Sequence, residues 1–303
     1  MVFTIGYVGN TSFHLSQTAD INTVPADDPN RINICGGNCG ATGGYNANYD
    51  RPYLGFAGVN LVLNQGNAHY DGLQATFQAT AWHNLTVGAA YTFSHAWDVI
   101  DAQLFNNLDD PMNAGYQYGT SGFDRRNIAV VNFDYKVPLF QNSQGLTKSL
   151  AGGWALSGVV LMQSGNPLSV NAANDNLGFG GDTTNHSDLL GTISYPHTFK
   201  QWFSPGAFAQ PAPLTWGNSP KNIVKGPGRD NWNLSLYKDF HIKESVGLQL
   251  RAETFNTWNH TQFTGVNNSV LTGNSSNPYN STAGQINAIA DPRVFQLGGK
   301  IYF

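Results

Sequence analysis

The stretch GLQATFQATAWHNLTVGAAYTFS at 72–94 decides the fold, because apolar and polar residues alternate along most of it. Odd positions from 73 to 81 and from 85 to 93 carry Leu, Val, Ala, Phe and Tyr, while most even positions carry Gln, Thr, Ser or Gly. A period of two is the signature of a β-strand with two different faces. Only residues 82–84 separate the two runs, so the stretch predicts a β-hairpin.

The same alternation recurs along the chain, and we count eight predicted strands: 3–7, 72–81, 85–94, 129–137, 154–162, 232–240, 246–253 and 294–303. Lys238 is an exception, since it falls on the apolar parity of its segment. The connections alternate strictly between short (82–84, 138–153, 241–245) and long (9–70, 94–126, 163–231, 255–293). Outer-membrane barrels have short periplasmic turns and long extracellular loops. The sequence therefore predicts an all-β fold of antiparallel transmembrane outer-membrane strands, with a periplasmic C-terminus.

Composition supports a membrane barrel over other classes. Charged residues make up 11% of the chain, against roughly 25% in soluble domains, yet mean hydropathy is only −0.29. No run approaches the roughly 20 apolar residues of a membrane-spanning helix. The net charge of −4, without a basic cluster, argues against a nucleic-acid partner. A soluble β-sandwich that binds sugars or proteins alternates equally well, but the asymmetry of the connections disfavours it.

Short motifs along nearly the whole chain resemble one family. They are GYVG at 6–9, YDGLQ at 70–74, AYTFS at 90–94, FDRR at 123–126, GGWALSG at 152–158, SGNP at 164–167, WFSPGAF at 202–208, GPG at 226–228, NWNLSLYK at 231–238, RAETFNTWNH at 251–260 and DPR at 291–293. In order and spacing they resemble the C-terminal barrel region of Oar-like TonB-dependent outer-membrane receptors.

The resemblance implies a barrel of about 22 strands, filled by an N-terminal plug through which the TonB complex drives active uptake of a bulky nutrient. The chain departs from this pattern, because we find no plug, TonB box, carboxypeptidase-regulatory-like domain or signal peptide. We therefore expect residues 1–303 to be a partial barrel domain, from a truncated gene, a split reading frame or an incomplete assembly. The alternative is a self-contained small barrel acting as an anchor, adhesin or narrow pore, since eight strands can close. The cargo is not encoded in any motif, and for the chain alone we favour an open sheet.

Four polar residues are candidates for the lumen: Arg126, Gln249, Arg251 and Glu253. Arg251 and Glu253 share one parity of their strand, where charges can stay hydrated or paired. They could touch cargo or plug, but we favour a structural ladder with neighbours such as Arg126 or Asp134.

The end of the chain resembles the signal that barrel-assembly machinery reads on a final strand. The residues that carry it are aromatic, apolar or small and share one parity: Phe295, Leu297, Gly299, Ile301 and Phe303. We expect outer-membrane lipid as the other partner, with Trp82, Trp154 and Trp232 forming an aromatic girdle at the periplasmic interface.

Cys35 and Cys39 are separated by three residues in a glycine-rich segment, which favours a disulfide in an oxidising compartment, with two free thiols as the alternative. Asp175, Asp182 and Asp188 lie in an oxygen-rich segment, but their spacing matches no EF-hand, so we favour a solvated loop over Ca²⁺. The aromatic and proline-rich segment 200–213 favours loop packing over a ligand platform. No catalytic, phosphate-binding or dinucleotide motif is present, so we predict neither an enzyme nor a cofactor.

Overall fold

The computed structural model describes residues 1–25, 28, 47–99, 101, 113–140, 142–173, 175–179, 184–243 and 246–303. Its main sheet has nine antiparallel strands, of which eight form a continuous path in the order β1-β2-β3-β5-β6-β11-β12-β15. These eight are β1 (Val2–Asp20), β2 (Asn60–Trp82), β3 (Leu85–Asp98), β5 (Asn127–Lys136), β6 (Trp154–Gln163), β11 (Arg229–Lys243), β12 (Val246–Phe255) and β15 (Val294–Tyr302). Each contains one of the predicted strands or most of it, so the predicted all-β antiparallel fold is confirmed.

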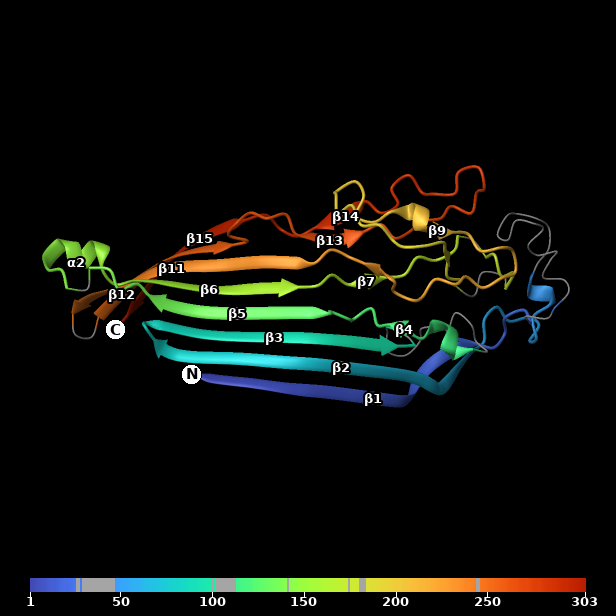
Figure 1. Ribbon diagram of the computed structural model, residues 1–303, viewed down its shortest axis with the longest axis horizontal. Coiled ribbons are helices and arrows are strands. Elements are labelled where there is room, and N and C mark those ends of the chain that lie inside the picture. The colour runs from blue at the N-terminus through green and yellow to red at the C-terminus, as the bar shows by residue number, and fades with distance from the viewer. Residues whose placement is uncertain are drawn as a thin grey trace.

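The two ends of the sheet differ in their connections, as Figure 1 shows. At one end, which we call the short-turn end, His83 and Asn84 close the β2–β3 hairpin with positive φ angles of 48° and 65°, the geometry that tight hairpins prefer. Helix α2 (Gly145–Ala151) lies at this end, between β5 and β6. The connections at the opposite, long-loop end contain the remaining elements. These are β4 (Gly119–Thr120), β7 (Pro167–Leu168), β8 (Asp188–Leu189), β9 (Phe208–Ala209), β10 (Val224–Lys225), β13 (Phe263–Val266), β14 (Ile286–Ile289) and the 3-10 helices η1 (Ala47–Tyr49), η2 (Ala114–Gln117) and η3 (Pro205–Ala207).

The register carries the alternation across the whole sheet. One row of directly paired residues is apolar across six neighbouring strands, from β1 to β11: Phe3, Phe77, Ala89, Val131, Val160 and Trp232. A row on the opposite face is polar across six neighbouring strands, from β3 to β15: Thr86, Asp134, Ser157, Ser235, Glu253 and Gln296. Because successive side chains of a strand point to opposite faces, the sheet has one apolar face and one polar face.

Apart from the connection between β5 and β6 at the short-turn end, no described part of the chain forms a layer over the apolar face. Phe3 is 66% exposed, Leu297 is 85% exposed, and Leu73, Tyr91, Leu236 and Leu250 are also exposed. Large apolar surface left open in this way marks contact with a partner or a membrane. Among the described residues, no helix combines the length and apolar character that crossing a membrane requires.

The sheet is open in the described part of the chain. β1 pairs only with β2, and β15 pairs only with β12. In Figure 1 these two strands lie on opposite sides of the sheet. This agrees with the open sheet that we favoured for the chain alone.

The first two strands are much longer than the sequence predicts. The predicted strands 3–7 and 72–81 belong to pairings that continue to Asp20 and Asn60, with a bulge near His14, which has a positive φ of 58°. The outer halves mix polar residues with apolar ones such as Phe13 and Leu61–Leu63 on both faces, so they lack the alternation on which the prediction relied. The backbone pairing of β1 with β2 continues through these halves without depending on that alternation.

Two long connections fold into a unit with its own core, which we call the loop unit (164–228 and 256–293). Its buried apolar side chains are Val170, Phe203, Ala207, Phe208, Val224, Val266, Val270, Leu271, Ala283 and Ile286. Three short two-stranded sheets, β7 with β10, β8 with β9 and β13 with β14, lie within it. Phe203 and Phe208 are fully buried, which confirms loop packing for this part of segment 200–213.

One expectation about the aromatic girdle is wrong. Trp82 and Trp154 lie at the short-turn end, but Trp232 pairs with Val160 in the outer half of β6 and follows a long connection. Its ring lies 6.1 Å from that of Trp258. The error arose because position along β11 was judged without its register.

Candidate functional site

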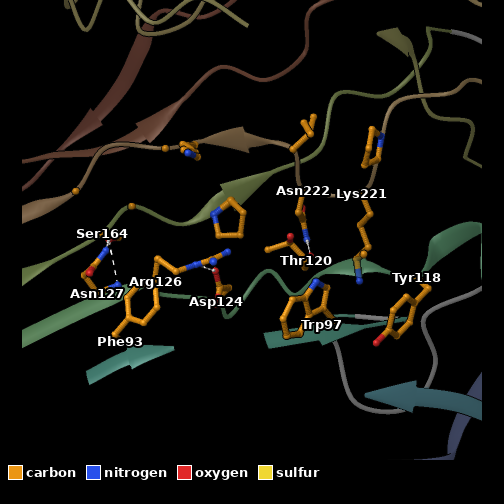
Figure 2. A pocket seen from close by; sticks show the side chains of 18 residues that line it. Phe93, Trp97, Tyr118, Thr120, Asp124, Arg126, Asn127, Ser164, Lys221 and Asn222 are labelled. Atoms are coloured by element: carbon orange, nitrogen blue, oxygen red, sulfur yellow. Dashed lines mark hydrogen bonds and ion pairs between the residues drawn. The ribbon is translucent and has the colours of Figure 1, made fainter. Parts of the chain in front are cut away.

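A pocket of about 900 Å³ opens at the long-loop end of the sheet. Its walls come from the outer end of β3, from the segment between β4 and β5, and from two parts of the loop unit near β7 and β10. In Figure 2, Arg126 extends beside Asp124 from one wall, while Lys221 and Asn222 approach Thr120 and Trp97 from the other. Residues far apart in the sequence therefore meet in one pocket.

A break in strand pairing shapes the first wall. β4 pairs with β3 at Trp97 and Asp98, whereas regular pairing of β3 with β5 begins only at Phe93 and Asn127. Between these points the chain bulges, and Asp124 accepts a 2.9 Å hydrogen bond from the backbone N–H of Ala96. Bulges redirect side chains at the rims of barrels, and this bulge places Asp124 and Arg126 in the pocket.

Three aromatic side chains line the pocket: Phe93, Trp97 and Tyr118. Phe93 and Tyr118 are exposed. The Trp97 ring is held by His95, with ring centroids 3.6 Å apart, and by His69, at 5.6 Å. The pocket therefore offers apolar ring surface, and one of its rings is fixed in place.

Lys221 joins the two walls. Its Nζ lies 2.6 Å from Asp98 Oδ1 and 3.1 Å from Asp101 Oδ1, and the side chain is only 8% exposed. It also donates to the carbonyl oxygen of Val99, at 3.2 Å. Burial alone would raise the pKa of the Asp101 carboxyl, but the hydrogen bond from the backbone N–H of Gly122 and the charge of Lys221 hold that pKa below its ordinary value of 3.8. Because Asp98 and Asp101 neutralise its charge, Lys221 holds the two walls together and is not a free cation for a ligand.

Asn222 reinforces the same junction. Its Nδ2 donates to Asp101 Oδ2, at 3.1 Å, and to the carbonyl oxygen of Thr120, at 2.8 Å. Asn127, on the sheet side, donates through its backbone N–H and its Nδ2 to Ser164 Oγ, at 3.2 and 3.1 Å. The loop unit is thus held on the sheet by hydrogen bonds at two points of the pocket.

Arg126, one of the four predicted lumen residues, lines this pocket with one long ion pair. Its nearest carboxylate oxygen, Asp124 Oδ2, lies 3.7 Å away, and its side chain is 41% exposed. A guanidinium presents five donors in a planar fork, so Arg126 can still donate to a ligand in the pocket.

The other three predicted lumen residues form a separate ladder on the polar face. Arg251 donates from Nη2 to Gln249 Oε1, at 2.8 Å, and lies 3.4 Å from Glu253 Oε1. The Tyr237 ring is 5.5 Å from the Arg251 guanidinium, and its hydroxyl donates to Asp134 Oδ2, at 2.6 Å. Asp134 is thus a neighbour, as expected. Arg126 is not, because it precedes Asp134 by eight residues, about 26 Å of extended chain.

The predicted assembly residues lie along one side of β15 and just beyond it. Register places Phe295 opposite Thr254, Leu297 opposite Ala252, Gly299 opposite Leu250 and Ile301 opposite Leu248, so all four lie on the apolar face. Phe303, the last residue, is 99% exposed. Their role in assembly remains a prediction.

The predicted disulfide lies outside the described residues, and the predicted acidic loop lies partly outside them. Cys35 and Cys39 lie outside them, as does Asp182. Asp175 Oδ1 accepts the backbone N–H groups of Gly178 and Phe179, at 2.9 and 3.1 Å, and Asp188 Oδ1 accepts that of Asn218, at 3.1 Å. These two carboxylates thus bind backbone within the loop unit.

Sequence reasoning missed most of the pocket: Trp97, Tyr118, Lys221 and Asn222. Each lies in a segment predicted to be a long connection, and Lys221 is 123 residues from Asp98. The Asp98 and Asp101 pair next to a predicted strand was a weak local signal. Nothing in the sequence links it to Lys221.

A family comparison agrees with this architecture. The sequence profile of the outer membrane beta barrel domain family matches residues 1–296. The chain belongs to this family. Its strands are therefore outer-membrane β-barrel strands, and its location is the outer membrane.

Among solved structures, the chain is similar to the outer membrane transporter YddB from Escherichia coli, with a TM-score of 0.47 and 9% sequence identity, covering 99% of this chain. The chain spans 30% of the length of that transporter chain. No curated protein sequence matches the chain.

Proposed function

We propose that this chain is the C-terminal barrel portion of an Oar-like TonB-dependent outer-membrane receptor that takes part in active uptake of a bulky nutrient. The observation that carries the proposal is the open sheet of an outer-membrane family member: β1 and β15 each have one strand partner among the described residues. An unpaired backbone N–H or C=O in lipid costs several kcal/mol. Both edge strands therefore need further strands to pair with. A barrel of about 22 strands would supply about 14 more.

Orientation and partners follow from the same proposal. The short-turn end faces the periplasm and the long-loop end faces outward, as in other outer-membrane barrels, which puts the C-terminus in the periplasm. The polar face, with Gln249, Arg251 and Glu253, lines the lumen, and the apolar face contacts outer-membrane lipid. The TonB complex would act through a plug supplied by another part of the receptor, and β15 would be read by the barrel-assembly machinery.

The pocket at the long-loop end supports a receptor role. Exposed rings at Phe93 and Tyr118, the fixed ring of Trp97 and the exposed guanidinium of Arg126 suit a ligand with apolar surface and a hydrogen-bond acceptor. The described lining lacks a nucleophile paired with a base, and membrane barrels of this kind suggest a non-enzymatic role. We assign the pocket to cargo contact, with cargo identity open.

Crosslinking across the edges tests the proposal. Starting from a Cys35→Ser, Cys39→Ser background, one cysteine is placed at Ile5 on β1 and one at Leu297, Gly299 or Ile301 on β15, and outer membranes are treated with a short bis-maleimide. In a wide barrel these strands lie apart, so we expect no crosslink within the chain. As a positive control, cysteines at Ile5 and Ala75, which are register partners on β1 and β2, must crosslink.

An efficient Ile5-to-β15 crosslink would show that the eight strands close on themselves. That result favours the alternative, a self-contained small barrel acting as an anchor, adhesin or narrow pore. A missing crosslink together with a native mass equal to this chain alone would also overturn the proposal, because no further strands would then be present.

A further inference from the structure

The connection between β5 and β6 bends onto the apolar side of the sheet at the short-turn end. Trp154, on the apolar face, donates from its indole N–H to the carbonyl oxygen of Leu150 in α2, at 3.1 Å. Lys238, also on the apolar face, donates from Nζ to the carbonyl oxygen of Gly152. Two side chains from the lipid-facing side thus hold the end of the connection, at Leu150 and Gly152, on that side.

This connection presents apolar side chains that the described residues leave uncovered. In α2, Leu146 and Leu150 are four residues apart, so they share a face of the helix, and they are 79% and 65% exposed. Leu139 and Phe140, just before the helix, are also exposed. These four side chains continue the open apolar face of the sheet, which family membership places against lipid.

Lysines surround a cavity of about 620 Å³ between this connection and the strand ends. Lys136, Lys148 and Lys238 line it together with Trp154. Lys136 has the polar-face parity of Asp134, but it is the last residue of β5 and lines the cavity at the short-turn edge of the sheet, where the two faces meet. Lys136 and Lys148 are exposed and have no ion pair among the described residues. Asp239, the carboxylate in the lining, accepts a 2.9 Å hydrogen bond from Gln249 Nε2.

The surroundings of Lys238 stabilise its positive charge on the apolar face. It is 3% exposed, and its Nζ lies 5.6 Å from the centroid of the Trp154 ring and 5.0 Å from that of Phe240. The charge is held by a carbonyl oxygen and two aromatic faces. It therefore adds positive potential to the cavity while its side chain holds the connection in place.

We propose that the connection 138–153 and its cavity bind one anionic phospholipid of the adjoining leaflet. The headgroup phosphate lies between Lys136 and Lys148, and the acyl chains run over Leu146, Leu150 and Trp154. A free anion would use only the lysines, whereas the uncovered leucines and the continuity with the lipid-facing surface favour a lipid. The site is independent of cargo and of TonB.

Native mass spectrometry of the protein extracted from outer membranes in mild detergent tests the proposal. The probes are phosphatidylglycerol, phosphatidylcholine and glycerol phosphate. We expect one phosphatidylglycerol to be retained preferentially. Because a lysine near an anionic lipid surface contributes about fivefold in affinity, Lys136→Gln with Lys148→Gln should weaken retention at least tenfold. Leu146→Ser with Leu150→Ser should weaken it as well.

Lys200→Gln with Lys300→Gln is the matched control, since it removes the same charge elsewhere. It should leave retention unchanged, and a heat-dependent gel shift confirms that every variant is folded. Equal retention of phosphatidylcholine, or unchanged retention in the Lys136 and Lys148 variant, would overturn the proposal. Equally tight binding of glycerol phosphate would show a simple anion site and would also overturn it.

Discussion

Lys221 and Asp98 are 123 residues apart in the chain, and their Nζ and Oδ1 atoms lie 2.6 Å apart. The contact joins the loop unit to the outer end of β3. Because Lys221 is 8% exposed and also contacts Asp101, one side chain links two parts of the pocket. Removing it leaves two partly buried carboxylates facing each other.

Lys221→Met should therefore loosen the loop unit. Breaking a buried ion pair from one side costs about 3–5 kcal/mol, and we expect faster proteolysis of the loop unit in intact outer membranes. Lys225→Met, at an exposed lysine of the same loop, should cost less than about 0.5 kcal/mol. Equal proteolysis rates for the two variants would contradict a structural role for Lys221.

Acid should remove the contribution of Asp101 to the same junction, whereas Asp98, whose pKa is raised by burial, contributes with the opposite sign. The pKa of Asp101 is held below 3.8 in the folded protein, although burial raises it, by the Gly122 hydrogen bond and the Lys221 charge. A depressed carboxyl pKa stabilises the folded state above the unfolded pKa, and the gain is lost as pH falls through the folded pKa. Loop proteolysis by an acid-active protease should therefore rise below about pH 4. Asp101→Asn should flatten that rise, and an unchanged pH profile would be inconsistent with the assignment.

The apolar face can be tested at Leu236, which pairs with Leu156 and Ala252. Leu236→Arg should cost about 2–4 kcal/mol of barrel stability, because it places a charge in lipid. Ser235→Arg, on the polar face opposite Glu253, should cost much less. The measurement is a denaturant titration of the protein in lipid vesicles. Similar costs for both would refute the assignment of the two faces.

The eight membrane strands could be predicted from sequence because burial in lipid on one face imposes a period of two. Lys238 broke that pattern, and only the structure shows its compensation by Gly152, Trp154 and Phe240. Alternation fails where neither face of a strand lies against lipid. The outer end of β1 is instead buried, with Ala19 packed against Val99, Leu63 and Ala114, and β1 and β2 therefore extend well beyond the predicted segments.

The pocket could not be predicted for a different reason. It forms where the loop unit meets the outer end of β3, through pairs such as Asn222 and Asp101 that lie 121 residues apart. Such contacts depend on tertiary folding and leave no local period. Arg126 was singled out from its place near the end of a strand, but its neighbours in the pocket were not.

Cys35 and Cys39 remain a prediction. A disulfide across three intervening residues should show as a loss of two hydrogens in the mass of the unreduced peptide from outer-membrane protein. Because the loop is predicted to face the cell exterior, an oxidising environment favours the bond. Quantitative alkylation of both cysteines without a reductant would rule it out.

The ladder on the polar face predicts a specific role for the Tyr237 hydroxyl. It donates a 2.6 Å hydrogen bond to Asp134 across β6, and its ring lies 5.5 Å from the Arg251 guanidinium. Tyr237→Phe keeps the ring and removes the donor, so Asp134 loses a partner while the contact with Arg251 stays. Hydrogen bonds to charged groups contribute about 1.5–3 kcal/mol, and water in a lumen replaces part of this. We therefore expect Tyr237→Phe to lower the free energy of unfolding by about 1 kcal/mol.

Tyr135→Phe is the control, because Tyr135 lies on the apolar face and its hydroxyl has no hydrogen-bond partner among the described residues. Denaturant titration of both single variants, of Asp134→Asn and of the double variant should show that Asp134→Asn costs less when Tyr237→Phe is already present than it does alone. Additive costs would mean that the hydroxyl and the carboxylate act independently, and the ladder would then not link β5 to β11.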